Sequence, residues 1–278
     1  MNNWAVLAIL GGLFSVLFNF GFKKILNSHN DTTILSWWYE ILRVIFVLPF
    51  VIFSSGTIFD SKTLLLLLVI GLTEFLSIYY FSKMHKYSEL SVSTTILRLR
   101  IVWIPLFASI LIHEKLYLNN YLGILLIFVG FFLVSGRKKF VFDKSIYFPL
   151  ICSVITAFSS VFIKQVANHV SPSIIVLAMS LPSVFIFPLL MKNWKGRAVG
   201  EILNHKLWVV TASMASVFAQ IFQNFALRFG SATQVSGLYQ SVSIVSIFMG
   251  IFVLGEKNNI ASKILGGLVV IVGAYLLI

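Results

Sequence analysis

Residues 86–115 read KYSELSVSTTILRLRIVWIPLFASILIHEK, and residues 228–257, which lie 142 positions further on, read RFGSATQVSGLYQSVSIVSIFMGIFVLGEK. Both stretches open with a basic, an aromatic and a small residue, cross an apolar run and close on a Glu-Lys pair. Two glycines seven residues apart follow each stretch, Gly123 and Gly130 in the first case and Gly266 and Gly273 in the second. Seven residues are two helical turns, so each pair lies on one helix face. The shared order and spacing indicate duplication of half the chain.

The composition places the chain in a lipid bilayer. Of its 278 residues, 59 % are hydrophobic and 11 % are charged, whereas a soluble domain carries about 25 % charged residues. Such a chain has too little polar surface to face water. Its net charge of +12 comes mostly from short connectors between apolar runs. This is the pattern of the positive-inside rule, so the expected partner is a membrane and no nucleic acid.

Apolar runs between polar breaks predict ten membrane spans, because a span needs about 20 apolar residues. The runs are residues 4–22, 34–53, 63–82, 91–112, 119–136, 146–166, 173–191, 207–227, 233–254 and 261–278. A basic connector, Arg137 to Lys144, separates two halves, so the expected repeats are residues 1–140 and 141–278. Five spans per half is an odd number, so the second half enters the membrane in the opposite orientation. The predicted fold is an all-α polytopic membrane protein of ten transmembrane helices in two inverted five-helix repeats, a plan common among secondary transporters.

The connector charges predict an orientation. Most connector Lys and Arg residues follow the odd-numbered spans, and only Lys62, Lys115, Lys164 and Arg228 follow the even-numbered ones. This bias places the odd connectors in the cytoplasm and both termini outside.

Five charged residues lie well inside predicted spans: Glu40, Arg43, Glu74, Arg98 and Arg100. Each costs roughly 2.5–3.5 kcal/mol at the centre of an isolated helix, so these side chains are expected to face a cavity or one another. Glu40 and Arg43 are three residues apart and can pair, whereas Arg98 and Arg100 point about 200° apart and cannot both line one small site. Glu74 is a candidate partner for one of these two arginines. The charges either bind substrate or a coupling proton, or they form ion pairs that hold the spans together.

Polar side chains at helical spacing mark the second half of the chain. They form one stripe in each of three spans: Ser153, Thr156, Ser160 and Lys164; Ser213, Ser216, Gln220, Gln223 and Asn224; Thr233, Ser236, Gln240 and Ser243. We interpret the stripes as the wall of a polar cavity, with interhelical hydrogen bonding as the alternative. Among nearby aromatic residues, Trp103 and Tyr239 are candidates for the wall of a substrate site, including a cation–π contact.

Other residue types point to no catalytic chemistry. The sequence has no Walker loop and no metal-ligand cluster, and its five histidines fall in connectors or at span ends. We therefore expect no cofactor, no metal and no catalytic residue. Pro105, Pro182 and Pro188 lie inside spans and predict kinks. The glycine pairs of spans 5 and 10 predict close helix packing or a dimer seam, so the expected state is a monomer or a homodimer.

The order of these features resembles the EamA-type transporters of the drug/metabolite transporter superfamily over essentially the whole chain. Leu254-Gly255-Glu256-Lys257 is similar to the family's Leu-Gly-Glu-Arg signature, whereas Ile112-His113-Glu114-Lys115 departs from it at the glycine position. Arg43 resembles an arginine often found in span 2 of the family. The resemblance implies a secondary transporter of a small polar metabolite in the cytoplasmic membrane, with a central cavity lined chiefly by spans 3, 4, 8 and 9. It also implies that both termini lie in the cytoplasm, contrary to the connector charges.

Three functions fit the sequence. The first is an alternating-access transporter for a small charged or zwitterionic metabolite, either amino-acid-like or an amine, with proton coupling as an option. Its substrate-binding residues would be Glu40, Arg43, Glu74, Arg98, Arg100, Trp103, Gln220, Asn224, Tyr239 and Gln240. The alternatives are an integral-membrane enzyme acting on a lipid-linked phosphate substrate and a passive metabolite channel. The lack of a convergent acid–base or metal set argues against the enzyme, and countertransport would separate a carrier from a channel.

Overall fold

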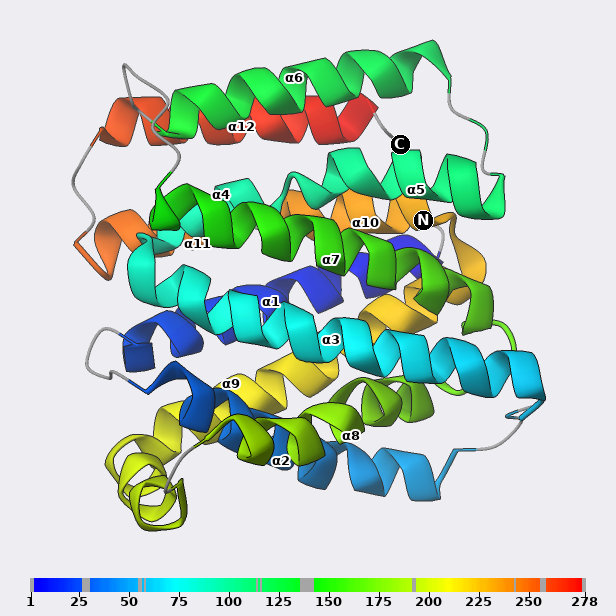
Figure 1. Ribbon diagram of the computed structural model, residues 1–278. Helices are drawn as coiled ribbons and strands as arrows, with labels where there is room; N and C mark the ends of the chain where they lie inside the picture. Colours follow the sequence, from blue (N-terminus) through cyan, green and yellow to red (C-terminus); the bar gives the residue numbers. More distant parts are fainter. Residues whose placement is uncertain are drawn as a thin grey trace.

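The computed structural model describes residues 3–26, 31–54, 57, 59–113, 115, 117–135, 143–191, 194–242, 244–255 and 259–276. These residues form a bundle of helices and contain no strand (Figure 1). The helices of the first half are α1 (Asn3–Leu26), α2 (Thr32–Ile52), α3 (Ser61–Tyr87), α4 (Leu90–Leu97), α5 (Arg100–Ile112) and α6 (Leu118–Ser135). Those of the second half are α7 (Lys144–Val166), α8 (Pro172–Leu190), α9 (Trp194–Phe229), α10 (Ala232–Ser241), α11 (Ile244–Phe252) and α12 (Ile260–Leu276).

The ten predicted spans are confirmed, with span 4 made of α4 and α5 and span 9 made of α10 and α11. Within the described residues, six helical segments are long and apolar enough to cross a bilayer: α1, α2, α3, α7, α8 and the part of α9 from His205 to Phe229. Spans 4 and 9 are absent from this set because each is interrupted in the middle. The remaining spans, α6 and α12, are shorter apolar helices.

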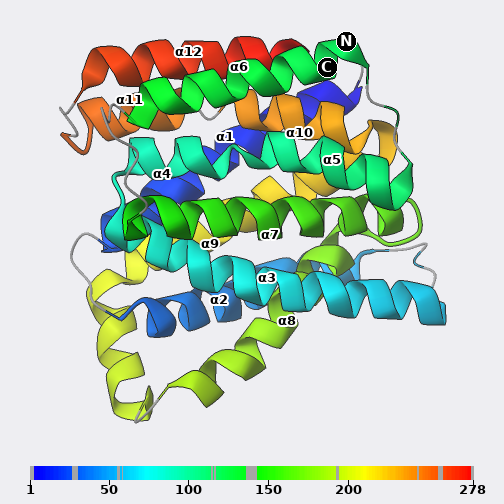
Figure 2. The same ribbon diagram turned by 45° about the horizontal axis from the view of Figure 1, so that its top comes forward.

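The two halves pack as an inverted pair. α2 lies along α8 and α6 along α12, which joins the second spans and the fifth spans of the two halves. α1 lies along α9, and α3 lies along α7, so the first span of each half packs on the third span of the other. Figures 1 and 2 both show α6 beside α12 and α3 beside α7. This reciprocal pairing is what two inverted copies of one five-span unit produce.

The close approach of spans 5 and 10 occurs within one chain. A Cβ atom added to Gly130 would lie 2.7 Å from the Gly266 carbonyl oxygen, and one added to Gly273 would lie 2.8 Å from the Gly123 carbonyl oxygen. The four glycines of the repeated pattern therefore form an antiparallel seam between α6 and α12. Small residues at such contacts let helix backbones pack closely in membranes.

The interruptions of spans 4 and 9 fall at corresponding places and are not at the predicted proline. α5 continues through Pro105, and the irregular turn lies before it, at Arg98 and Leu99. There the Ile101 N–H donates to the Arg98 carbonyl at 2.8 Å, a tighter turn than the α-helical one. In span 9 the Val245 N–H donates to the Val242 carbonyl at 3.1 Å.

The connector before span 8 differs from the prediction because it is itself partly helical. α9 begins at Trp194, well before the expected span, and its backbone leaves helical geometry at His205, with φ −130° and ψ 16°. The residues from 194 to 204 thus form a helical segment that leads into the span. The Trp38 indole N–H of α2 donates to the Ala198 carbonyl at 2.9 Å and holds this segment against the bundle.

The bundle has two opposite faces. α1 begins and α12 ends at the same face, which we call the terminal face (Figure 1). At the opposite face, which we call the basic face, α1 ends with Lys23 and Lys24 and α3 ends with His85 and Lys86.

Candidate functional site

A cavity of about 70 Å³ lies between the two halves, in the middle of the bundle. Within its described lining, the charged side chains are Glu74 and Arg100. Neutral polar side chains around them come from α1, α3, α7 and α9: Ser15, Asn19, Ser77, Thr156, Ser216 and Gln220. Aromatic rings complete the wall: Phe18, Tyr39, Phe81 and Tyr239. Spans 3, 4, 8 and 9 contribute as the family resemblance implies, but spans 1, 2 and 6 contribute as well.

One wall of the cavity is supported by an arginine that joins two carboxylates. The Arg43 Nη1 donates to Glu40 Oε1 at 3.1 Å and to Glu74 Oε1 at 2.9 Å. The side chains of Glu40 and Arg43 are fully buried, while that of Glu74 is 12 % exposed. Glu40 and Arg43 pair because they are three residues apart on one face of α2. Glu74 was a candidate partner for Arg98 or Arg100, and the structure corrects this, since its ion pair is with Arg43.

Arg100 is the first residue of α5 and lies on the far side of the cavity from α2. Its guanidinium carbon is 5.3 Å from the centre of the Tyr239 ring, a cation–π geometry. With the Gln240 amide oxygen turned toward the guanidinium, Nη2 of Arg100 donates to it at 2.7 Å and Nε donates to it as well. Arg98 is only 1 % exposed and is outside the described lining. The two arginines therefore do not line one site together, as predicted, but the reason is the break between α4 and α5 at Arg98 and Leu99 and not the spacing on one helix.

Hydrogen-bonded hydroxyl groups and stacked aromatic rings join α1, α2, α3 and α9 where these helices line the cavity. The Tyr39 hydroxyl and Ser216 Oγ are 2.5 Å apart and share a hydrogen bond between α2 and α9. Phe18 of α1 and Phe81 of α3 stack with their ring centres 4.9 Å apart and their planes 8° apart. Phe81 also packs on the ring of His85, which lies toward the basic face, with the ring centres 4.5 Å apart.

Of three other predicted site residues, one lines the cavity and two lie outside its described lining. Gln220 lines the cavity. Asn224 is fully buried, and neither of its amide atoms has a hydrogen-bond partner among the described residues. Trp103 is on α5, and its indole N–H donates to Ser153 Oγ of α7 at 3.2 Å. It is outside the described lining.

Asn19 and Tyr39 line the cavity but are not among the predicted substrate-binding residues. Asn19 is one of two polar residues in the first apolar run, and its amide donates to the carbonyl of the other, Ser15, at 2.6 Å. Tyr39 directly precedes Glu40, and its ring lies 5.3 Å from the Arg43 guanidinium carbon. Ser15 and Asn19 are four residues apart inside an apolar run, and this helical spacing is the signal that could have indicated Asn19.

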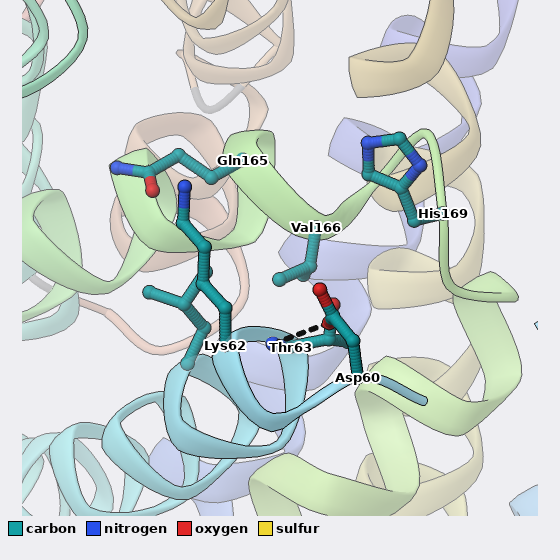
Figure 3. Close-up of a pocket in the computed structure, with 7 residues that line it drawn as sticks. Asp60, Lys62, Thr63, Gln165, Val166 and His169 are labelled. Carbon is teal, nitrogen blue, oxygen red and sulfur yellow. Dashed lines mark hydrogen bonds between the residues drawn. The ribbon is translucent and has the colours of Figure 1, made fainter. Parts of the chain in front are cut away.

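A second hollow, of about 490 Å³, opens at the terminal face between the start of α3 and the end of α7 (Figure 3). Figure 3 shows Lys62 extending toward Gln165 on one side, with Asp60 and His169 on the other. Hydrogen bonds from the side chain and backbone of Thr63 hold the pKa of Asp60 below its ordinary value. Asp60, Lys62 and His169 are solvent-exposed, and the described lining contains none of the predicted site residues. The central cavity is therefore the better candidate site.

Comparisons with known proteins agree with this architecture. A comparison with the curated proteins finds no match. Among solved structures 28 chains match, and one described as "Crystal structure of protein" has a TM-score of 0.70 at 16 % identity, covering 98 % of this chain and 97 % of that one. At this identity the likeness shows the fold alone.

The family comparison is more specific. The model of the EamA-like transporter family matches the chain twice, over residues 2–136 and 143–278. Two matches that together span nearly the whole chain are consistent with the two inverted halves and the polar cavity between them. The chain is therefore a multi-pass membrane transporter of small molecules and belongs to the EamA-like transporter family.

Proposed function

We propose that the protein carries a small zwitterionic metabolite of the amino-acid kind across the cytoplasmic membrane by alternating access. The observation that carries this proposal is the pair of opposite charges, Glu74 and Arg100, in the described wall of one central cavity. A zwitterion presents a carboxylate and an ammonium group at once. A cavity with one acid and one base from different helices matches both groups.

Arg100 is suited to the carboxylate of the substrate. A guanidinium has five N–H donors in a planar fork that matches a carboxylate in two-point contact. The hydrogen bonds to Gln240 use only part of this set and orient the group together with the Tyr239 ring. Arg100 is also the first residue of α5, where the helix dipole adds partial positive charge.

Glu74 is suited to the ammonium group or to a coupling proton. Arg43 is shared between two carboxylates, so the ionised cluster of Glu40, Arg43 and Glu74 has an excess of one negative charge. Of the two acids, Glu74 is the one in contact with the cavity. Ionisable groups at membrane depth are costly, and those that face a cavity typically mark a substrate or proton path.

The small volume of the cavity supports alternating access. Pockets for small molecules usually enclose about 300–1,000 Å³, and this cavity has about 70 Å³. A metabolite can enter only if the surrounding helices separate. The proposal therefore includes a closed state that opens toward one face at a time.

A ligand screen tests the assignment of the two charges. The melting temperature of the purified protein is measured with each of the common amino acids, small amines and small carboxylates, at two pH values. A ligand at 100 times its Kd stabilises the folded state by about 2.7 kcal/mol. We expect an amino acid to raise the melting temperature of the wild type, and the increase to be lost in Arg100→Gln and in Glu74→Gln.

Lys62→Gln is the matched control, because Lys62 is a charged residue of the second hollow. It should bind the ligand as the wild type does. The proposal is wrong if no ligand of these classes stabilises the protein. It is also wrong if Lys62→Gln loses the ligand while Arg100→Gln and Glu74→Gln keep it.

A further inference from the structure

Two lysines make the same contact in the two halves of the chain. Lys23, in the last turn of α1, donates from Nζ to the His85 carbonyl at 2.7 Å and to the Ser88 carbonyl at 2.6 Å. Lys164, in the last turn of α7, donates to the Leu227 carbonyl at 2.6 Å and to the Gly230 carbonyl at 2.8 Å. Both pairs of acceptors are separated by the 142 positions of the sequence repeat. In each half, the first span thus binds the carbonyl end of the third span.

These contacts are made at opposite faces of the membrane. Lys23 joins the ends of α1 and α3 at the basic face, whereas Lys164 joins the ends of α7 and α9 at the terminal face. An ammonium group at the carbonyl end of a helix is favoured by its hydrogen bonds and by the helix dipole. The inversion of the second half places the second copy of the contact on the other side of the bilayer.

The four helices that carry these contacts also surround the cavity. α1 packs along α9, and α3 packs along α7, so the cavity lies between two packed pairs. Each lysine bridges the two pairs at one face only. Separation of α1 from α3 would open the cavity toward the basic face, and separation of α7 from α9 would open it toward the terminal face.

Side chains between the cavity and each lysine strengthen the two closures. On the basic side, the Phe18–Phe81 stack is followed by a 3.3 Å hydrogen bond between Asn19 and His85, and then by Lys23. Lys23 itself is only 8 % exposed. This closure therefore has several buried layers.

The terminal side has a second cation in place of the aromatic stack. Arg228 of α9 donates from Nε to the Ala167 carbonyl at 2.8 Å and from Nη2 to the Val170 carbonyl at 2.8 Å. The ends of α7 and α9 thus bind each other in both directions, through Lys164 and through Arg228.

We propose that Lys23 and Lys164 are gate residues of the transporter, with Lys23 closing the cavity toward the basic face and Lys164 closing it toward the terminal face. Both contacts are formed here, and the cavity is small, so the structure corresponds to the state closed on both sides. Release of one lysine at a time gives the two open states. This inference rests on the proposed alternating access and adds the residues that control each side.

Thiol labelling from each face tests the gates. A reporter thiol is placed in the cavity by Ser77→Cys, in a Cys152→Ala background that removes the single native cysteine. Vesicles of known orientation are treated with a membrane-impermeant thiol reagent, and Lys24→Cys, at an exposed position, identifies the basic face. We expect Lys23→Met to raise the labelling rate several-fold from the basic face only. Lys164→Met should raise it several-fold from the terminal face only.

Exposed lysines at the same faces provide controls. Lys24→Met and Lys62→Met remove a charge without removing a carbonyl contact and should label as the background does. Lys23→Arg, which keeps charged N–H donors, should keep the basic face closed. If Lys23→Met does not fold, Lys23→Gln takes its place in the same measurement.

Opening of the same face by both lysine variants, or of neither face, would overturn the proposal. The labelling needs no substrate, so its result is independent of the ligand screen. A failed screen with face-specific labelling would reject the proposed substrate class and leave the gates. A ligand found in the screen, together with labelling that is not specific for one face, would reject the gate residues and leave the proposed substrate site.

Discussion

At the scale of single residues, Arg43 is the cation that compensates the charge of two carboxylates beside the cavity. It is the cation between buried Glu40 and partly exposed Glu74, and its loss would leave both carboxylates without an ion-pair partner among the contacts described. Removing one partner of a buried pair costs about 3–5 kcal/mol. Arg43→Gln should therefore lower the melting temperature far more than Glu40→Gln, which leaves Arg43 paired with Glu74. Equal melting temperatures for the two variants would show that the cluster is not a coupled unit.

The residue before each repeated Glu-Lys pair adopts a left-handed backbone. His113 has φ 54° and Gly255, at the matching position, has φ 71°. This region costs a residue with a Cβ roughly 1–2 kcal/mol. Gly255→Ala should therefore destabilise the protein even though an added Cβ would meet no atom within 4 Å. Gly200→Ala is the control, because Gly200 has equal space inside a helix and alanine there should stabilise by about 0.5–1 kcal/mol.

Gly255→Ala and Gly200→Ala should change the melting temperature in opposite directions. A fall for Gly255→Ala with a rise for Gly200→Ala supports the backbone argument. His113→Gly should not destabilise the protein, because it removes the left-handed strain. This explains why the first copy can depart from the family signature at this position: the backbone is kept, and the strain is tolerated.

Local spacing was enough to predict some residue contacts and could not predict others. The Glu40–Arg43 pair follows from helix geometry alone, whereas Arg98 and Arg100 lie on the two sides of a break between α4 and α5 that helix geometry does not predict. The Arg43–Glu74 contact depends on how α2 and α3 are aligned, which no local pattern contains. The sequence assigns Lys23 to the connector charges and Lys164 both to these charges and to the polar stripe of span 6. It does not show that both lysines bind the end of a neighbouring helix, because a lysine at the end of an apolar run can equally extend to the interface.

At the scale of elements, hydropathy predicted the spans but not their interruptions. In span 9 the first part, α10, carries the polar stripe and the second part, α11, is apolar. The break in span 4 occurs at Arg98 and Leu99, without a proline or glycine. Hydropathy places residues 192–206 between two spans and does not reveal the helical segment from 194 to 204, because this segment is too polar and too short to be a span. The hydropathy of a sequence indicates how long an apolar run is. The position at which a long helix is interrupted depends on tertiary packing, which hydropathy does not contain.

The seam between α6 and α12 leaves no space for a side chain at Gly130. An added Cβ at Gly130 would lie 2.6 Å from Val270 Cγ2 and 2.7 Å from the Gly266 carbonyl oxygen. Overpacking of this kind costs typically 1–3 kcal/mol. Gly130→Ala should therefore lower the melting temperature of the protein. Val270→Ala in the same chain should restore only part of the loss, because it removes the side-chain clash and leaves the backbone clash. Full restoration would show that the two backbones are not in close contact.

At the scale of the whole molecule, the repeat predicted the inverted architecture from parity alone. The reciprocal packing of α1 on α9 and of α3 on α7 is its three-dimensional form. The site between the halves was only partly predictable. Its charged residues and polar stripes were visible in the sequence, whereas the contributions of α1 and α2 arise from the way the two halves meet.

The central claim is that one cavity between two inverted halves carries a zwitterionic metabolite in an alternating manner. Counterflow in proteoliposomes tests it most directly. Vesicles containing the protein are loaded with unlabelled amino acids, diluted, and supplied with a trace of the same amino acid in labelled form. Only a carrier, and not a channel, accumulates the label above equilibrium. We predict a transient, saturable accumulation in the wild type and in Lys62→Gln, and its loss in Arg100→Gln. Flux that neither saturates nor accumulates, or that is unchanged in Arg100→Gln, would contradict the account.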